Sequence, residues 1–141
     1  MKIYKGQVTK LEPNQIFVFG SNTQGRHGKG AAKIAHDLFG AVYGISRGFT
    51  GNCYAICTKD LTKKVHPSVS EQDIVYQICK LYQEAKLHSE KEFLIPYDTQ
   101  NSNLNGFSSE EMAKMFKKAG EIPENIIFKE DFAHLLNCLM V

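Results

Sequence analysis

The 141-residue sequence has no long apolar run and no leader-like start. No segment approaches the roughly 20 apolar residues that a membrane-spanning helix requires. Residues 1–10 alternate between apolar and polar side chains, whereas a signal peptide has a basic start followed by a continuous apolar stretch. These absences predict a cytoplasmic protein without a membrane partner.

The chain also has little excess of charge of either sign. Lys and Arg number 17 and Asp and Glu number 15, so the formal net charge is +2. A protein that binds nucleic acid along a broad surface has a much more basic balance. We therefore expect the positive charge to act locally.

Cysteine is sparse and irregularly spaced. Cys53 and Cys57 form a single C-x3-C pair, and Cys79 and Cys138 stand far from it. Neither a second pair nor a histidine cluster lies at zinc-binding spacing. The sequence therefore predicts buried free thiols in a reducing compartment, with no metal and no cofactor.

Length and continuity indicate one domain over residues 1–141. A chain of this length with 43% apolar residues is long enough for one well-packed domain and short for two. We find no internal repeat, low-complexity tract or linker.

The most informative segment combines an apolar run, a glycine-rich loop and a helical pattern. Residues 16–19 are apolar and end at Gly20, and Gly25, Gly28 and Gly30 follow. Apolar residues then recur on one helical face up to Phe39, with Gly40 placed as a left-handed C-terminal cap. The pattern predicts a strand, a loop and a helix over residues 30–39. It is neither a Walker A loop nor G-x-G-x-x-G.

This arrangement favours an anion site. The first N–H groups of a helix are unpaired and lie at the positive end of its dipole, and glycines let a ligand approach the main chain. Arg26, Lys29 and Lys33 add positive charge. The alternative is a tight strand-to-helix turn with ordinary surface lysines. Four glycines beside a strand end, with Ser21 and Asn22, favour the binding site.

Strand-like and helix-like segments alternate along the chain. This order predicts an α/β fold in which helices cover both faces of a mixed, mostly parallel sheet. The strand-like segments are residues 2–5, 16–19, 53–58, 93–96 and 126–128, the helix-like segments are residues 30–39, 70–85, 108–119 and 132–139, and residues 44–51 read as a glycine-spaced loop.

Ligands of such sheets bind beyond the carboxyl ends of the strands. Three loops qualify: residues 20–30, the segment that begins at Thr58-Lys59-Asp60, and residues 97–107. The third is rich in Asn and Ser, which suit hydroxyl and phosphate groups but are equally common in any solvated turn.

Four pieces of the chain, taken in order, resemble the macrodomains, a family that binds ADP-ribose. Residues 5–11 resemble the family's Gly-Asp-Ile-Thr opening, and residues 18–22 its strand ending in Asn. Residues 28–35 resemble its glycine-rich loop and helix, and residues 93–96 the strand before its second phosphate loop. Residues 39–42 and Thr58-Lys59 are closer to the terminal ADP-ribose hydrolases and the toxin–antitoxin ADP-ribosyl-DNA hydrolases. The resemblance implies a three-layer αβα fold.

The resemblance and the glycine-loop pattern together imply a set of ligand-binding residues spread over the three loops and the opening segment. These are Gln7, Val8, Gly20, Ser21, Asn22, Gly25, His27, Gly28, Lys29, Gly30, Ala31, Thr58, Lys59, Asn103, Asn105, Gly106 and Phe107.

For catalysis, the resemblance implies Lys59, because the hydrolase branch uses the lysine after the threonine on the distal ribose. Asp60, Asp98 and His27 are the nearby acids and bases that could assist it. Three positions depart from the family pattern. Gln7 replaces the Asp that reads the adenine amino group, Asn105 replaces the second-loop acid of the hydrolases, and Ala32 replaces the Asp of another catalytic branch.

These residues leave three hypotheses. The favoured one is binding of ADP-ribose or a related NAD-derived nucleotide without turnover, because backbone N–H groups hold a diphosphate whatever the catalytic residues are. The second is an ADP-ribosyl hydrolase that uses Lys59 on an ADP-ribosylated macromolecule or an ADP-ribose derivative. The third is an interaction module with a vestigial pocket. The apolar end of the chain, residues 135–141, is either the last core helix or a self-association surface.

Overall fold

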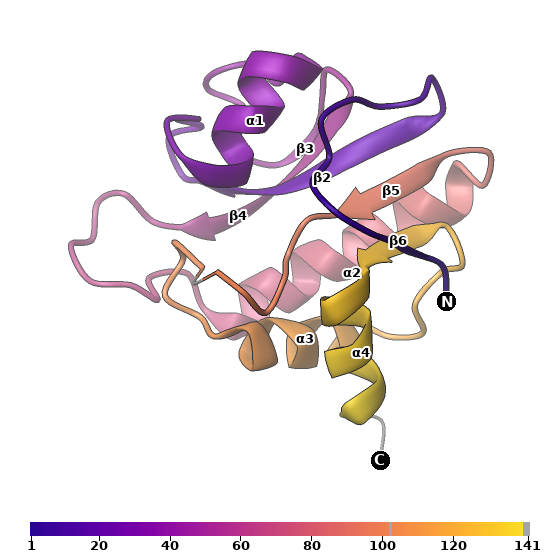
Figure 1. Ribbon diagram of the computed structural model, residues 1–141. Coiled ribbons are helices and arrows are strands. Elements are labelled where there is room, and N and C mark those ends of the chain that lie inside the picture. Colours follow the sequence, from indigo (N-terminus) through magenta and orange to yellow (C-terminus); the bar gives the residue numbers. More distant parts are fainter. Residues whose placement is uncertain (102, 140–141) are drawn as a thin grey trace.

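The computed structural model describes residues 1–101 and 103–139. These residues form one six-stranded mixed sheet with four helices (Figure 1), which confirms the predicted α/β class. The strand order is β1-β6-β5-β2-β4-β3, and every neighbouring pair is parallel except β3 with β4. The elements are β1 (Ile3–Tyr4), β2 (Gln15–Asn22), α1 (Gly30–Phe39), β3 (Gly48–Thr50), β4 (Cys53–Lys59), α2 (Glu71–Leu87), β5 (Glu92–Ile95), α3 (Ser109–Lys118), β6 (Ile126–Lys129) and α4 (Glu130–Cys138).

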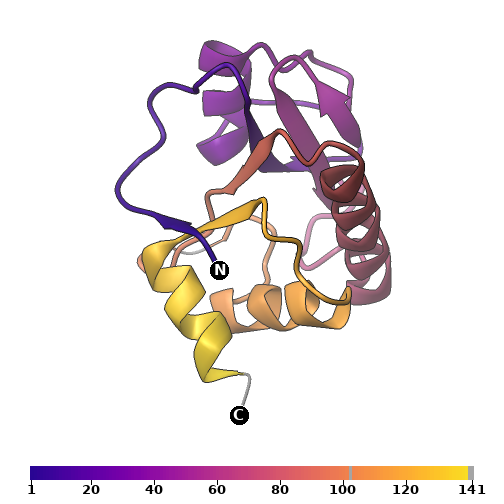
Figure 2. The same cartoon turned by 90° about the vertical axis from the view of Figure 1, so that its right-hand side faces the viewer.

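Alternate side chains of the central strand β2 face two different cores, as the two-residue period of a strand requires. Phe17 and Phe19 pack with Ala35 and Phe39 of α1. Val18 packs on the opposite face, in the larger core shared with α2, α3 and α4. Figures 1 and 2 show α1 on one side of the sheet and α2 and α3 on the other. Helices therefore cover both faces, as predicted.

The predicted helix ends are present. Ser70 accepts a hydrogen bond from the N–H of Asp73 at the start of α2. Ser108 and Glu111 form the capping box of α3. Gly40 ends α1 with a φ of 82°, in the left-handed conformation expected of a C-terminal glycine. Local sequence alone determines these boundaries, because each cap lies within one helical turn of its partner.

Residues 44–51 are not entirely a loop, and this expectation was wrong in part. Gly48, Phe49 and Thr50 form β3, which pairs antiparallel with β4. The pairing satisfies main-chain groups at the edge of β4, a reason that the glycine-spaced sequence does not reveal. A sharp turn joins the two strands at Gly51, where a Cβ would lie 2.3 Å from the carbonyl oxygen of Gly40.

The C-terminal residues 135–139 belong mainly to the predicted last helix. Leu136 of α4 is buried in the larger core, whereas residues 140 and 141 lie outside the described part of the chain.

No helix among the described residues is long and apolar enough to cross a bilayer. The cysteines are free thiols, of which Cys53 and Cys57 are buried as expected and Cys138 is exposed.

Candidate functional site

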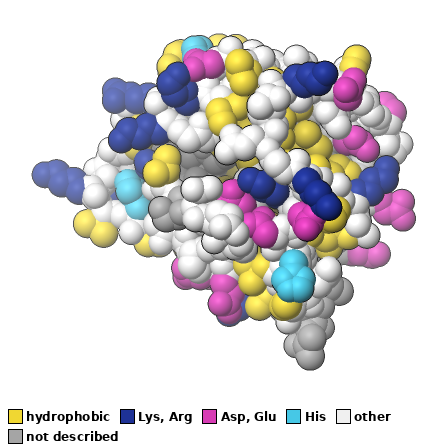
Figure 3. Space-filling model, viewed as in Figure 1, with side chains coloured by type: hydrophobic (Ala, Val, Ile, Leu, Met, Phe, Trp, Pro, Cys, Tyr) yellow, Lys and Arg dark blue, Asp and Glu magenta, His cyan; other side chains and the backbone are white. Residues whose placement is uncertain are grey.

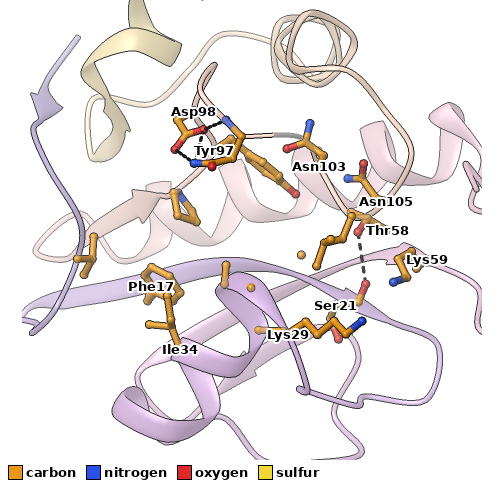
Figure 4. A pocket seen from close by; sticks show the side chains of 18 of the residues that line it. Phe17, Ser21, Lys29, Ile34, Thr58, Lys59, Tyr97, Asp98, Asn103 and Asn105 are labelled. Carbon is orange, nitrogen blue, oxygen red and sulfur yellow. Dashed lines mark hydrogen bonds between the residues drawn. The ribbon is translucent and has the colours of Figure 1, made fainter.

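A cavity of about 560 Å³ lies at the edge of the sheet where the parallel strands β2, β4 and β5 end. Its walls come from the start of α1, the glycine-rich loop, the loop after β5 and the segment after β1. Figure 4 shows Phe17 and Ile34 at one end of this cavity and Thr58, Lys59 and Asn105 toward the other. The carboxyl edge of a parallel sheet is where such folds collect ligand-binding loops.

The first turn of α1 is open toward this cavity. Gly30, Ala31 and Ala32 line it, and the N-cap residue Lys29 makes no side-chain capping hydrogen bond. The first turn contains no acidic residue, in contrast to the first turns of α2, α3 and α4. The unpaired N–H groups and the positive end of the helix dipole therefore remain available to an anion.

Gly28 is a glycine that neither the backbone nor the packing requires. Its φ is not positive, and a Cβ built there meets nothing within 4 Å. Gly30 differs, because its φ is +59° and a Cβ would lie 3.3 Å from Cδ1 of Leu104. The vacant space beside Gly28 belongs to the cavity, so a ligand there can reach the main chain.

Positive charge is concentrated in the cavity wall. Arg26, Lys29, Lys59 and Lys129 line it, and Asp98 is the one carboxylate among the described lining residues. Asp98 and Lys129 form an ion pair at 3.1 Å, which leaves the other three cations in excess. Figure 3 shows Lys and Arg side chains on the side of the molecule that carries α1 and the β4–α2 loop, and others at the centre and on the opposite side of the same face.

Asn22 organises the glycine-rich loop. Its side-chain Nδ2 donates to the carbonyl oxygen of Arg26 at 2.7 Å, and its Oδ1 accepts from the N–H groups of Gln24 and Arg26 at 3.2 and 3.0 Å. These three bonds hold residues 22–26 in a tight turn. Asn22 therefore lines the cavity while its side chain fixes the loop that leads to α1.

The ends of β2 and β4 form the floor of the cavity. The Thr58 hydroxyl donates to the carbonyl oxygen of Ser21 at 3.3 Å. Gly20 has an ordinary strand conformation, but a Cβ there would lie 3.1 Å from the Tyr97 hydroxyl and 3.2 Å from that of Thr58. Glycine thus gives Tyr97 room beneath the strand end. The hydroxyls of Ser21 and Tyr97 are buried and have no hydrogen-bond partner among the described residues.

The structure separates the four candidate catalytic residues. Lys59 and Asp98 line the cavity, whereas Asp60 and His27 do not. The Asp60 carboxylate accepts hydrogen bonds from the side chain and main chain of Thr62, which lower its pKa. His27 turns away from the cavity and is 1% exposed.

Asp98 is fully engaged by its neighbours. Its carboxylate accepts from the main chain of Gln100, from the main chain and side chain of Asn101, and from Lys129. Burial by itself would raise the pKa of Asp98, but the bonds from Asn101 and Lys129 outweigh burial and lower it. A carboxylate held in this way stays ionised and is a poor proton donor at neutral pH.

Most of the residues expected to bind the ligand line the same cavity, and four do not: His27, as described above, and three others. Gly25 packs against Gly44, Gly106 packs against the main chain of His66 and Pro67, and Phe107 belongs to the larger core. The expected ligand-binding residues that line the cavity are Gln7, Val8, Gly20, Ser21, Asn22, Gly28, Lys29, Gly30, Ala31, Thr58, Lys59, Asn103 and Asn105.

Several lining residues carry no local signal in the sequence. They come from five different elements or their ends and meet only after folding: Tyr4, Phe17, Ile34, Pro96, Tyr97 and Lys129.

In residues 1–101 and 103–139, no three His, Cys, Asp or Glu side chains converge on a possible metal site. No protein-family model matches the chain, and no curated protein matches it either.

Proposed function

We propose that this protein binds a nucleotide of the ADP-ribose type, with its diphosphate held by main-chain N–H groups of the glycine-rich loop and the first turn of α1. The observation that carries the proposal is the convergence on one cavity of an uncapped helix start, the vacant space at Gly28 and three cations that form no ion pair among the described residues. Helix N-termini bind phosphate for this reason. The two helix-covered faces of the sheet support a three-layer, macrodomain-like fold.

The shape and lining of the cavity suit the rest of such a ligand. A volume of about 560 Å³ falls within the range of roughly 300–1,000 Å³ typical of small-molecule sites. Val8, Ile34 and Pro96 offer apolar contact for a flat base. Lys59, Asn103 and Asn105 offer polar groups for ribose hydroxyls.

Binding without turnover is the better supported form of the proposal. Hydrolysis requires a proton donor or base beside the scissile bond. The hydrogen bonds to Asp98 lower its pKa, which makes the group both a poor proton donor and a weak base. Asp60 and His27 lie outside the cavity, and Asn105 does not titrate. The donors for a diphosphate are main-chain groups and do not depend on any of these side chains.

Thermal unfolding with nucleotides tests the proposal directly. Saturating ADP-ribose will raise the melting temperature, because a ligand selective for the folded state stabilises it by about 2.7 kcal/mol at one hundred times its dissociation constant. ADP and NAD will give smaller shifts. If none of a panel of adenine and other nucleotides shifts the transition, binding and hydrolysis both fail, and the interaction module remains.

Lys59 favours hydrolysis as a second candidate function, because it lines the cavity. An uncharged lysine amine can attack a ribose C1″ while the bond from C1″ to the ADP-ribosylated group breaks and that group leaves with a proton. We expect ADP-ribosylated protein, ADP-ribosylated DNA and O-acetyl-ADP-ribose to remain intact with the wild-type protein. Lys59→Ala should keep measurable affinity for ADP-ribose. Release of free ADP-ribose by the wild type, and its loss in Lys59→Ala, would establish the hydrolase instead.

A further inference from the structure

His27 is the most unusual side chain near the proposed site. It lies in the glycine-rich loop and is 1% exposed, and neither of its ring nitrogens makes a hydrogen bond of normal geometry among the described residues, although the main chain at Ile45 is close enough to influence its pKa. A buried polar group without a partner costs free energy. The loop nevertheless turns this histidine inward rather than toward solvent. Because this burial costs free energy, we expect the His27 ring to serve a function.

The surroundings of His27 are aromatic. Its ring stacks on Tyr43 at 5.3 Å and meets the edge of Phe19 from β2 at 5.2 Å. The titratable groups that face it are His36 of α1, with a ring centroid 6.1 Å away, and Tyr43 of the segment after α1. His36 in turn uses its Nδ1 on the carbonyl oxygen of Ala41 at 2.9 Å. No carboxylate is among these ring contacts, so an imidazolium would have no counter-charge there.

The same contact fixes the glycine-rich loop to the segment after α1. The Gly44 N–H donates to the carbonyl oxygen of Gly25 at 3.0 Å, and a Cβ on Gly25 would lie 2.5 Å from the Gly44 carbonyl carbon. The two main chains therefore lie against each other, with the His27 ring inserted beside them. The next residue along the chain is Gly28, and α1 begins two residues later.

We propose that neutral His27 is a positioning residue for the anion site: its buried ring holds residues 25–30 in place, and protonation releases the loop and weakens diphosphate binding. This inference rests on the proposed function. A proton on the ring would have to be accommodated in an aromatic pocket, so the charged ring is expelled to water instead. Expulsion moves the residues whose N–H groups form the site, and proton and ligand therefore compete.

The direction of the pKa agrees with this role. Burial is the main cause that lowers the pKa of His27 below 6.5, and the nearby His36 lowers it further, while the main chain at Ile45 partly opposes the shift. The neutral ring therefore contributes stability that is present above pH 6.5 and is lost as the pH falls through the folded-state pKa. Ligand affinity follows the same direction, with a limiting decrease of about tenfold per pH unit for one competing proton.

Isothermal titration of ADP-ribose from about pH 5 to about pH 8 tests the inference. His27→Phe keeps an aromatic ring against Tyr43 but cannot be protonated, so its affinity should stay flat while that of the wild type falls at acid pH. His134→Gln, on the remote helix α4, should retain the wild-type profile. Equal pH dependence in wild type and His27→Phe would overturn the role of His27.

Nuclear magnetic resonance of the unliganded protein separates this inference from the proposed function. The amide signals of residues 28–31 should shift with the same apparent pKa as the His27 imidazole, and these shifts should be absent in His27→Phe. If the amide signals of residues 28–31 do not change as the His27 imidazole titrates, the coupling between His27 and the loop is refuted, whatever ligand the protein binds. Absence of nucleotide binding at every pH, with the amide coupling present, would overturn the proposed function and leave the loop control standing.

Discussion

Gly28→Val will leave the protein folded and reduce its affinity for ADP-ribose by about one hundredfold, equivalent to about 2.7 kcal/mol. Gly28 has no positive φ, and a Cβ there meets no protein atom within 4 Å, so valine has both the conformation and the space it needs. That space is part of the cavity. The isopropyl group will occupy the position from which a phosphate reaches the main chain. Isothermal titration measures the loss, and thermal unfolding verifies the fold.

Two further variants make this experiment specific. Gly28→Ala adds a single methyl group and should give an intermediate loss of affinity. Gln24→Val places the same valine side chain in the same loop, at an exposed residue that does not line the cavity, and should bind like the wild type. Unchanged affinity in Gly28→Val would place the ligand elsewhere on the protein.

Gln77→Leu will lower the free energy of unfolding by about 2 to 6 kcal/mol, since each buried polar group left without a partner costs roughly 1–3 kcal/mol. The buried Gln77 amide of α2 donates to the carbonyl oxygen of Cys57 at 2.8 Å and accepts from its N–H at 2.7 Å. β3 reaches only as far as the pair Gly48 with Ala55, so the side chain of Gln77 continues the hydrogen bonding along the edge of β4. Leucine fills a similar volume and satisfies neither group.

Chemical denaturation measures this effect, and an exposed glutamine on the same helix provides the control. Gln83→Leu should stay within about 0.5 kcal/mol of the wild type, as surface substitutions usually do. Because Thr58 and Lys59 directly follow Cys57 on β4, Gln77→Leu should also weaken nucleotide binding at temperatures where the protein remains folded. A Gln77→Leu protein as stable as the wild type would mean that water replaces the amide on the β4 edge.

Sequence patterns predicted those features whose causes lie within a few residues. The end of α1 at Gly40, the capping box at Ser108 and Glu111, and the short apolar runs that become strands each depend on residues inside one turn or one strand. The glycine-rich loop belongs to the same class, because Gly20, Gly28 and Gly30 directly flank a strand end and a helix start, and the structure places all three in the cavity wall. The sequence did not predict β3, because the extended conformation of residues 48–50 depends on their pairing with β4.

The sequence by itself determined the α/β class, the helix caps and the open start of α1, because hydrophobic period and capping act locally. Only the tertiary structure decided the direction in which individual side chains of the loops turn. His27 lies within the glycine-rich loop yet packs inward on Tyr43, and the Asp98 carboxylate accepts hydrogen bonds from Asn101 and Lys129 instead of facing a ligand. These outcomes depend on partners 16 and 31 residues away in the chain for Tyr43 and Lys129, and folding brings such partners together by packing that no local pattern encodes.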